Sequence, residues 1–180
     1  MSKMFKVSSV LLILLGILIP FLSFTKYEIK RIHDRKKVEE VLIQNNYYAI
    51  LEIDKINLKR ELYDINDSRN NVNQNIMLHK KSVMPHENIN SHIILAAHSG
   101  NGSQAYFQNL YLLEIGDIIK FYYQNKIWIY EIVEIEYQDK TGVLYLKEDY
   151  KEMITLITCT KGKSDKQTIY YGRLKEWKNV

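Results

Sequence analysis

The chain contains a single cysteine, Cys159, which stands directly after an apolar run at residues 153–158. A thiol becomes a strong nucleophile when it is deprotonated, because the thiolate is the reacting species. His98 occupies the same kind of position after a second apolar run, residues 92–97. A histidine within reach of a cysteine can take its proton and later protonate a leaving amine. The two residues therefore predict nucleophilic catalysis, if the fold brings them together.

Position alone is weak evidence for catalysis. A lone cysteine in an apolar strand is more often a small buried hydrophobe than a reactive thiol. One cysteine also excludes an intramolecular disulfide and zinc sites built on cysteine pairs. The remaining histidines are expected to be structural or surface residues, namely His33, His79, His86 and His92. The functional prediction therefore depends on the sequence around Cys159 and His98.

Two short motifs surround these residues. Residues 155–159 are TLITC, and residues 95–100 are LAAHSG. The first matches the TLxTC signature of sortases without a mismatch, and the second resembles the segment around the sortase catalytic histidine, with Ala97 where glycine is usual. The order of histidine and cysteine, about 60 residues apart, is also that of the family. The signature residues are Thr155, Leu156, Thr158 and Cys159.

Weaker similarity to sortases extends over most of the chain, roughly residues 48–174, through residues 51–58, 106–110, 113–117 and 140–142. The resemblance implies an eight-stranded β-barrel and a cysteine transpeptidase. Such an enzyme cleaves an LPxT-like sorting signal on a secreted protein through a thioester on the cysteine, here Cys159. An amine of peptidoglycan or of a pilin subunit then resolves the thioester. The resemblance further implies a Gram-positive host and a catalytic domain that faces outward.

The third catalytic residue of the family, an arginine at the start of the strand after the cysteine loop, has two candidates. Arg173 is the one arginine beyond Cys159, but a strand beginning there alternates poorly. A strand over residues 168–174 alternates well and puts Gln167 at the arginine position. The two residues would then stand six positions apart on one strand, about 20 Å, too far to serve one site. The strand pattern favours Gln167, whose amide can donate to an oxyanion but lacks the charge and fork of arginine.

Short strands separated by polar stretches dominate the chain after residue 46. The pattern predicts a mainly β domain, a barrel with short helices. Gln124 and Asn125 are expected to form the turn of a hairpin, and a helical turn is expected at residues 105–110. The predicted strands are residues 48–53, 92–97, 118–123, 126–137, 153–158 and 168–174.

Residues 7–25 carry no charge and are long enough to span a bilayer as a helix. The sequence therefore predicts a cytoplasmic tail and transmembrane anchor at 1–25, a juxtamembrane stalk helix at 26–46 and a catalytic barrel at 47–180. A cleaved signal peptide is the alternative, but charged residues follow the apolar run directly. Lysines and arginines are more frequent after the span than before it, which favours a cytosolic barrel. The motifs favour the outside, and we adopt that orientation.

The net charge of +4 is concentrated near the N-terminus, and no basic stripe interleaved with aromatic residues indicates nucleic-acid binding. No cofactor is expected. Asp64, Asp67 and Glu87 could bind calcium in a loop, as in some sortases, but they lack a recognisable ligand spacing.

Two other functions remain open. One is a catalytically inactive, membrane-anchored barrel that binds peptides, and the other is a hydrolase of the same geometry. Pilus-assembling sortases often carry an aromatic Asp-Pro lid and a second membrane span. This sequence has neither, which favours an anchoring sortase with one N-terminal span, of a class D-like kind.

Overall fold

The computed structural model describes residues 47–87, 90–142, 146–147 and 151–179. The predicted tail and anchor at 1–25 and the predicted stalk at 26–46 lie outside the described residues. Within the described part of the chain, no helix is both long and apolar enough to cross a membrane.

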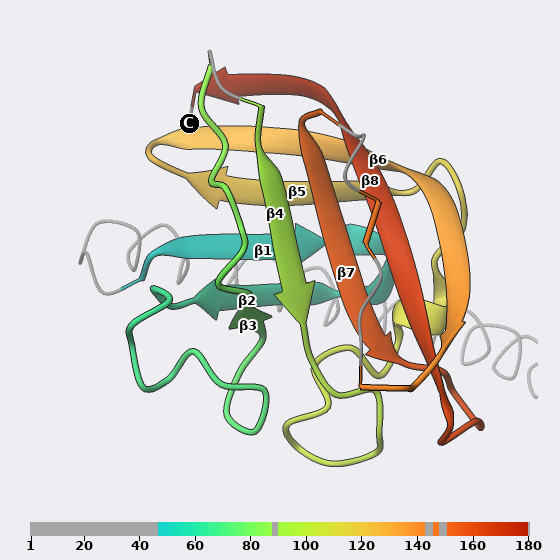
Figure 1. The fold of residues 1–180 in the computed structure, drawn as a ribbon. Coiled ribbons are helices and arrows are strands. Elements are labelled where there is room, and N and C mark those ends of the chain that lie inside the picture. Colours follow the sequence, from blue (N-terminus) through green and yellow to red (C-terminus); the bar gives the residue numbers. More distant parts are fainter. Residues whose placement is uncertain (1–46, 88–89, 143–145, 148–150, 180) are drawn as a thin grey trace, which may run out of the picture. The chain divides into compact units, whose positions relative to one another are not determined.

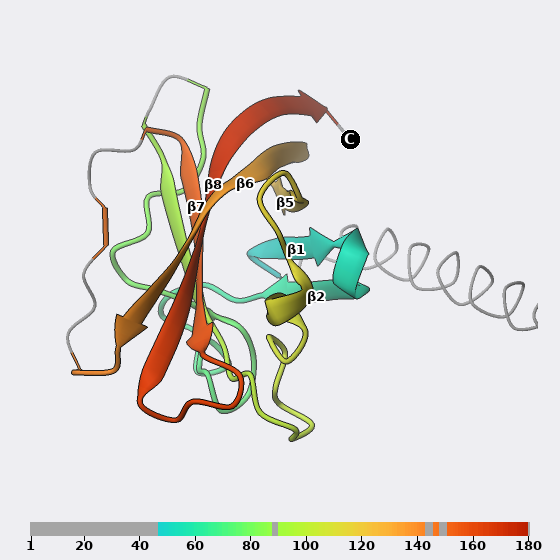
Figure 2. The same ribbon diagram turned by 90° about the vertical axis from the view of Figure 1, so that its right-hand side faces the viewer.

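Eight strands form one sheet in the order β2-β1-β5-β6-β8-β7-β4-β3. The sheet curls until its two ends face each other, so that it makes a nearly closed barrel (Figures 1 and 2). This confirms the prediction of a mainly β, eight-stranded barrel with short helices. The strands are β1 (Ala49–Ile53), β2 (Leu58–Leu62), β3 (Met77–Leu78), β4 (His92–Ala96), β5 (Ile118–Tyr123), β6 (Lys126–Asp139), β7 (Met153–Cys159) and β8 (Lys166–Asn179), and the 3-10 helices are η1 (Asp54–Ile56) and η2 (Leu110–Leu112).

The β5–β6 hairpin forms where the sequence predicted it. Gln124 and Asn125 have φ angles of 50° and 60°, and Tyr123 pairs with Lys126 across the turn. A two-residue turn with positive φ at both positions matches the right-handed twist of the flanking strands. The hairpin therefore has a local cause in the sequence.

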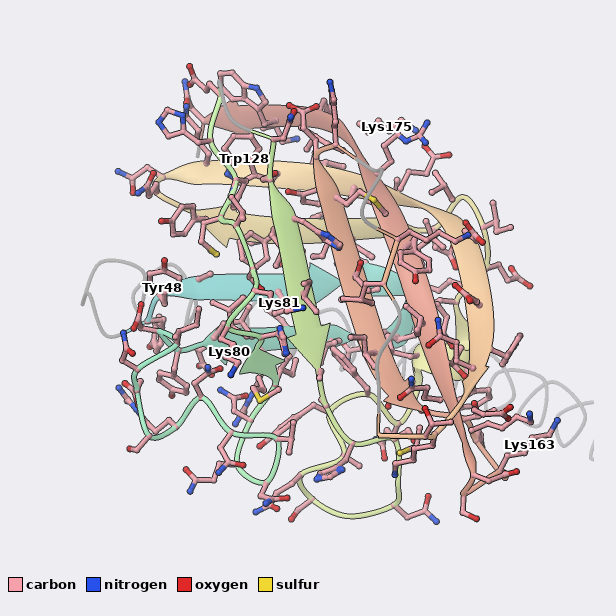
Figure 3. All side chains as sticks on the ribbon, in the orientation of Figure 1. Tyr48, Lys80, Lys81, Trp128, Lys163 and Lys175 are labelled. Atoms are coloured by element: carbon pink, nitrogen blue, oxygen red, sulfur yellow. The ribbon has the colours of Figure 1, made fainter. Side chains whose placement is uncertain are left out.

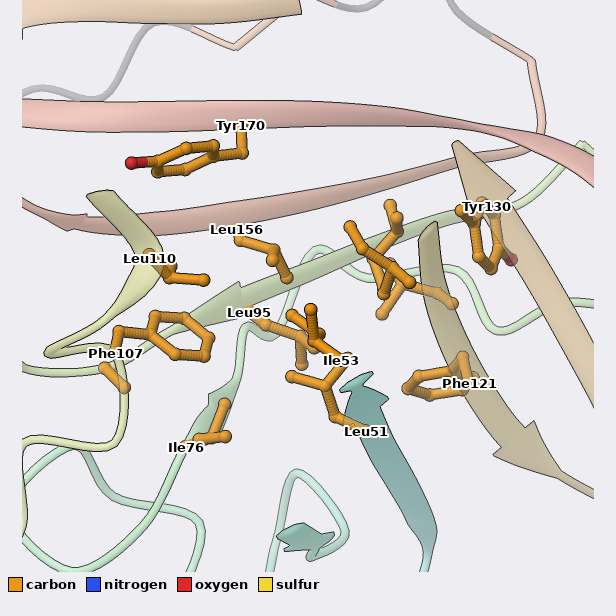
Figure 4. Close-up of a cluster of buried hydrophobic side chains, with 14 of the residues drawn as sticks. Leu51, Ile53, Ile76, Leu95, Phe107, Leu110, Phe121, Tyr130, Leu156 and Tyr170 are labelled. Carbon is orange, nitrogen blue, oxygen red and sulfur yellow. The ribbon is translucent and has the colours of Figure 1, made fainter. Parts of the chain in front are cut away.

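Side chains from most strands meet in one hydrophobic core inside the barrel (Figure 4). β1 is buried over its whole length, and all of its residues except Glu52 are apolar. In β7, Ile154 and Leu156 belong to this core, whereas Ile157 packs into a second cluster with Ile169 of β8. Because neighbouring residues of a strand face opposite sides, β7 is covered on both.

β8 is longer than the predicted strand and reaches Asn179, because its last residues pair with the start of β6. There Trp177 lies opposite Trp128, with the ring centroids 5.9 Å apart. The polar strand β2 and the two-residue strand β3 were not predicted. The 3-10 helix η2 lies at Leu110–Leu112, later than the helical turn predicted at 105–110.

Candidate active site

His98 and Cys159 lie beside each other because β4 and β7 run parallel. The ladder pairs Leu95 with Leu156 and Ala96 with Ile157, so the same register carried two residues further brings His98 level with Cys159. Adjacent strands are about 4.8 Å apart. Figure 1 shows the C-terminal ends of both strands on the same side of the sheet. The structure thus brings together the two residues that the sequence singled out.

Three hydrogen bonds hold the ends of the two strands together. The backbone N–H of Ala97 donates to the carbonyl of Ile157 at 3.3 Å, and Thr158 Oγ1 donates to the carbonyl of Ala97 at 2.8 Å. Ser99 Oγ donates to the carbonyl of Cys159 at 2.7 Å. The backbone around the imidazole and the thiol is therefore fixed, while Cys159 stays half-buried and His98 exposed. Groups held in this way need little reorganisation to react.

The other signature residues support the strand rather than the reaction. Leu156 is fully buried in the core. Thr155 is also buried, and its Oγ1 lies 2.7 Å from His92 Nε2. Burial lowers the pKa of His92 below its ordinary value, because desolvation disfavours the charged ring. His92 thus has a structural partner, as the sequence led us to expect.

Asn73 contacts the imidazole of His98, a contact that no pattern in the sequence indicated. Asn73 Oδ1 lies 3.0 Å from His98 Nε2. Because an amide oxygen only accepts hydrogen bonds, this contact requires the proton on Nε2 and leaves Nδ1 as the acceptor in the neutral ring. Asn73 belongs to a polar loop between β2 and β3, and only the tertiary fold brings it to His98.

A network around Arg60 holds this loop in place. Arg60 Nε donates to Asn75 Oδ1 at 3.0 Å, and its Nη2 donates to Tyr106 Oη at 2.9 Å. Tyr106 Oη donates in turn to the carbonyl of Gln74 at 3.1 Å. Since Tyr106 follows His98 along the chain and Gln74 follows Asn73, the network joins the two segments that carry the contact between Asn73 and His98.

The two candidates for the third site residue lie at opposite ends of the β7–β8 ladder. Gln167 pairs directly with Cys159, whereas Arg173 pairs with Met153. Directly opposite residues share one face of a sheet, so the Gln167 side chain lies on the face of the thiol. Gln167 Nε2 donates to Gln138 Oε1 at 3.4 Å. The structure therefore brings Gln167, and not Arg173, to Cys159.

A cation also reaches the sulfur. Lys140 Nζ lies 3.5 Å from Cys159 Sγ, from the first residue after β6. The sequence assigned residues 140–142 only to the start of a loop.

Two hollows lie near the candidate site, and the second of them includes His98 in its lining. One, of about 330 Å³, is lined by tyrosines and by the loop after β7, including Tyr111, Tyr137, Thr160, Lys161 and Tyr170. The other, of about 320 Å³, is lined by His98 and the segment that follows it, residues 100 and 102–105.

The described residues contain no group of three or more His, Cys, Asp and Glu side chains that could hold a metal ion. Asp67 forms an ion pair with Arg69 at 2.6 Å, and Glu87 forms one with Lys126. Asp64 Oδ1 accepts from the backbone N–H of Asn66 at 2.9 Å. The carboxylates considered for calcium thus have protein partners.

Comparison with known proteins gives a consistent result. The sortase domain model matches residues 51–175. No curated protein matches the chain by sequence. Among solved structures, sortase A of Listeria monocytogenes superposes with a TM-score of 0.60 at 18% identity, covering 76% of this chain and 92% of its own. A Clostridium perfringens sortase transpeptidase gives 0.59 at 23%, covering 78% and 89%, and a Streptomyces coelicolor sortase with a tripeptide in the active site gives 0.59 at 23%, covering 74% and 90%.

Proposed function

Because the chain belongs to the sortase family, we propose that it is a cysteine transpeptidase, with Cys159 as the nucleophile and His98 as the acid–base partner. The observation that carries the proposal is the parallel β4–β7 ladder. Cys159 is the last residue of β7, and His98 follows the end of the neighbouring strand β4. The substrate is an LPxT-like sorting signal on a secreted protein. The acceptor is an amine of peptidoglycan or of a pilin subunit.

The reaction follows from the chemistry of the two groups. The Cys159 thiolate attacks the carbonyl carbon of the scissile amide, so a C–S bond forms and the π electrons move to the oxygen. The C–N bond then breaks as the His98 imidazolium gives its proton to the leaving amine, and a thioester remains. The acceptor amine attacks the thioester, loses a proton to His98 and releases the thiolate.

Gln167 is proposed as a donor to the oxyanion of the tetrahedral intermediates, because it lies opposite Cys159 in the ladder. Asn73 holds the imidazole through its contact with Nε2. Residues 7–25 are proposed to anchor the chain in the membrane of a Gram-positive cell, with the barrel outside.

The test uses the full-length chain in detergent, a library of LPxT-like peptides and an amine acceptor. We expect mass spectrometry to detect an acyl adduct on Cys159 and a ligated product. Replacing Cys159 with Ala should remove the adduct, and the His98→Ala variant should form product at least about 10³-fold more slowly. A cleaved peptide without ligated product would indicate a hydrolase instead. No adduct with any peptide would contradict the enzyme proposal and favour a peptide-binding barrel.

A further inference from the structure

Lys140 lies on the same face of the sheet as the thiol. Gln138 on β6 pairs with Gln167 on β8, and Gln167 pairs with Cys159 on β7, so these three side chains stand in one row on one face. Lys140 follows Gln138 by two residues, which returns its side chain to that face. Its backbone N–H donates to the carbonyl of Asp165 at 2.7 Å, which extends the ladder beyond the end of β6.

The ammonium group of Lys140 reaches across β8 to the sulfur. Lys140 Nζ lies 3.5 Å from Cys159 Sγ. Its neighbour Asp139 is held by Lys166 at 2.6 Å, whereas the ion pairs within the described part of the chain do not include Lys140. Because successive residues face opposite sides of a strand, the Asp139 carboxylate lies on the face away from the thiol. It therefore does not neutralise the Lys140 ammonium group beside Cys159.

Other cations in this part of the barrel have another partner or lie far from the sulfur. Lys161, in the loop after β7, has its ammonium group 3.4 Å from the centroid of the Tyr111 ring. Arg173 stands opposite Met153, at the far end of the ladder from Cys159. Gln167, which lies opposite the thiol, carries no charge. The positive charge at the sulfur therefore comes from the end of β6 and not from the start of β8.

We propose that Lys140 is a catalytic residue that forms an ion pair with the Cys159 thiolate and then stabilises the oxyanion of the tetrahedral intermediate. It stays protonated throughout: the sulfur electrons form the C–S bond, the charge moves to the carbonyl oxygen, and the ammonium group remains within reach of both atoms. His98 alone transfers the proton to the leaving amine. This inference rests on the proposed transpeptidase function for the oxyanion step, but the ion pair with the thiolate does not require a substrate.

The first test therefore uses no substrate. The rate of alkylation of Cys159 by iodoacetamide reports the thiolate, because the thiolate is the reacting species. At pH 7 and low salt, we expect Lys140→Met to be alkylated about 10-fold more slowly than the wild-type chain, and Lys140→Arg to stay within about 3-fold. Because Lys140 is exposed, 1 M KCl should reduce the difference between the wild type and Lys140→Met.

Lys163→Met is the matched control. Lys163 is an exposed lysine of the β7–β8 loop, labelled in Figure 3, and its loss changes the net charge by the same amount. Its alkylation rate should equal that of the wild type. Equal alkylation rates for wild type and Lys140→Met would overturn the inference, and so would an equal loss in Lys163→Met, because the effect would then be one of general charge.

The second test measures thioester formation with the sorting-signal peptides, where Lys140→Met should slow the appearance of the adduct by about 10-fold or more. If the wild type forms the thioester and Lys140→Met forms it equally fast, the catalytic role of Lys140 is wrong and the transpeptidase proposal stands. If the wild type forms no thioester while Lys140→Met still slows alkylation, the ion pair stands and the transpeptidase proposal fails.

Discussion

Gln167 lies directly opposite Cys159 in the antiparallel ladder of β7 and β8. The bond from its amide to Gln138 Oε1, at 3.4 Å, is long and is easily exchanged for a bond to a substrate oxygen. Arginine at this position would bring a charge, whereas glutamine brings only a neutral donor. The neutral hydrogen-bond donor, Gln167, therefore comes from β8. The cation that reaches the thiol, Lys140, comes instead from the end of β6.

Replacing Gln167 with Ala should lower kcat for acyl transfer by about 100-fold, because one oxyanion donor is lost. The matched control is Arg173→Ala on the same strand, which lies opposite Met153 and should retain activity within about 3-fold. Steady-state kinetics with an LPxT-like peptide and an amine measure both. The opposite result, an active Gln167→Ala and an inactive Arg173→Ala, would show that the strand register does not decide the third residue.

Asn73→Ala should lower kcat by about 10-fold with little change in KM, because the imidazole loses the contact that holds its ring and tautomer. Asn73→Asp keeps an acceptor oxygen and should restore most of kcat, with the pH–rate profile displaced upwards because a carboxylate stabilises the imidazolium. Asn101→Ala, in the exposed loop after His98, is the control. An unchanged pH profile in Asn73→Asp together with full activity of Asn73→Ala would contradict a positioning role.

Glu52 on β1 makes the stability of the barrel depend on pH. Burial acts to raise its pKa, but hydrogen bonds from Lys59 and Lys120 outweigh it and lower the pKa to about 2. Since this lies below the ordinary value of 4.5, the contribution is complete above pH 4.5 and is lost as the pH falls towards 2. Glu52→Gln should therefore cost about 2 to 3 kcal/mol at pH 7, and less at pH 3.

Urea unfolding at the two pH values measures this difference. Glu114→Gln is the control, because Glu114 pairs with Lys55 at an exposed position and should change the free energy of unfolding by less than about 0.5 kcal/mol. If the loss of unfolding free energy in Glu52→Gln were the same at both pH values, the cause would be the shape of the side chain and not its charge.

Gly172 lets β8 pass close to its neighbours. A Cβ at this position would lie 2.8 Å from Ile154 Cγ2 and 3.3 Å from Tyr130 Cβ. Gly172→Ala should therefore lower the free energy of unfolding by about 1 to 3 kcal/mol through overpacking. Gly102→Ala, where nothing lies within 4 Å, should change it by less than about 0.5 kcal/mol, as thermal or urea unfolding would measure.

The parts of the fold that were predicted have local causes. The β5–β6 hairpin follows from Gln124 and Asn125 between two alternating segments, and β4 and β7 from short buried apolar runs. β2 was missed because its sequence, LKREL, is polar. Its side chains find partners only in the fold: Lys59 pairs with Glu52 at 2.5 Å, and Arg60 bonds to Tyr106.

The candidate site also contains residues that the sequence predicted and residues that it did not. The short motifs around His98 and Cys159 singled out these two residues, and strand alternation favoured Gln167 over Arg173. Asn73 and Lys140 could not be found, because each meets its partner across a distance in sequence that no local pattern encodes, 25 residues for Asn73 and 19 for Lys140. Both lie in polar stretches whose composition indicates only a loop.

The β4–β7 ladder is the one parallel ladder among the described strands. A parallel pair cannot form through a hairpin, and here the connecting chain includes the whole β5–β6 hairpin. Closing so long a loop is entropically costly and slow, so we expect the β4–β7 ladder to form late in folding. Catalysis that needs both His98 and Cys159 would then appear only in completely folded chains, and a partly folded chain would carry a thiol without its acid–base partner.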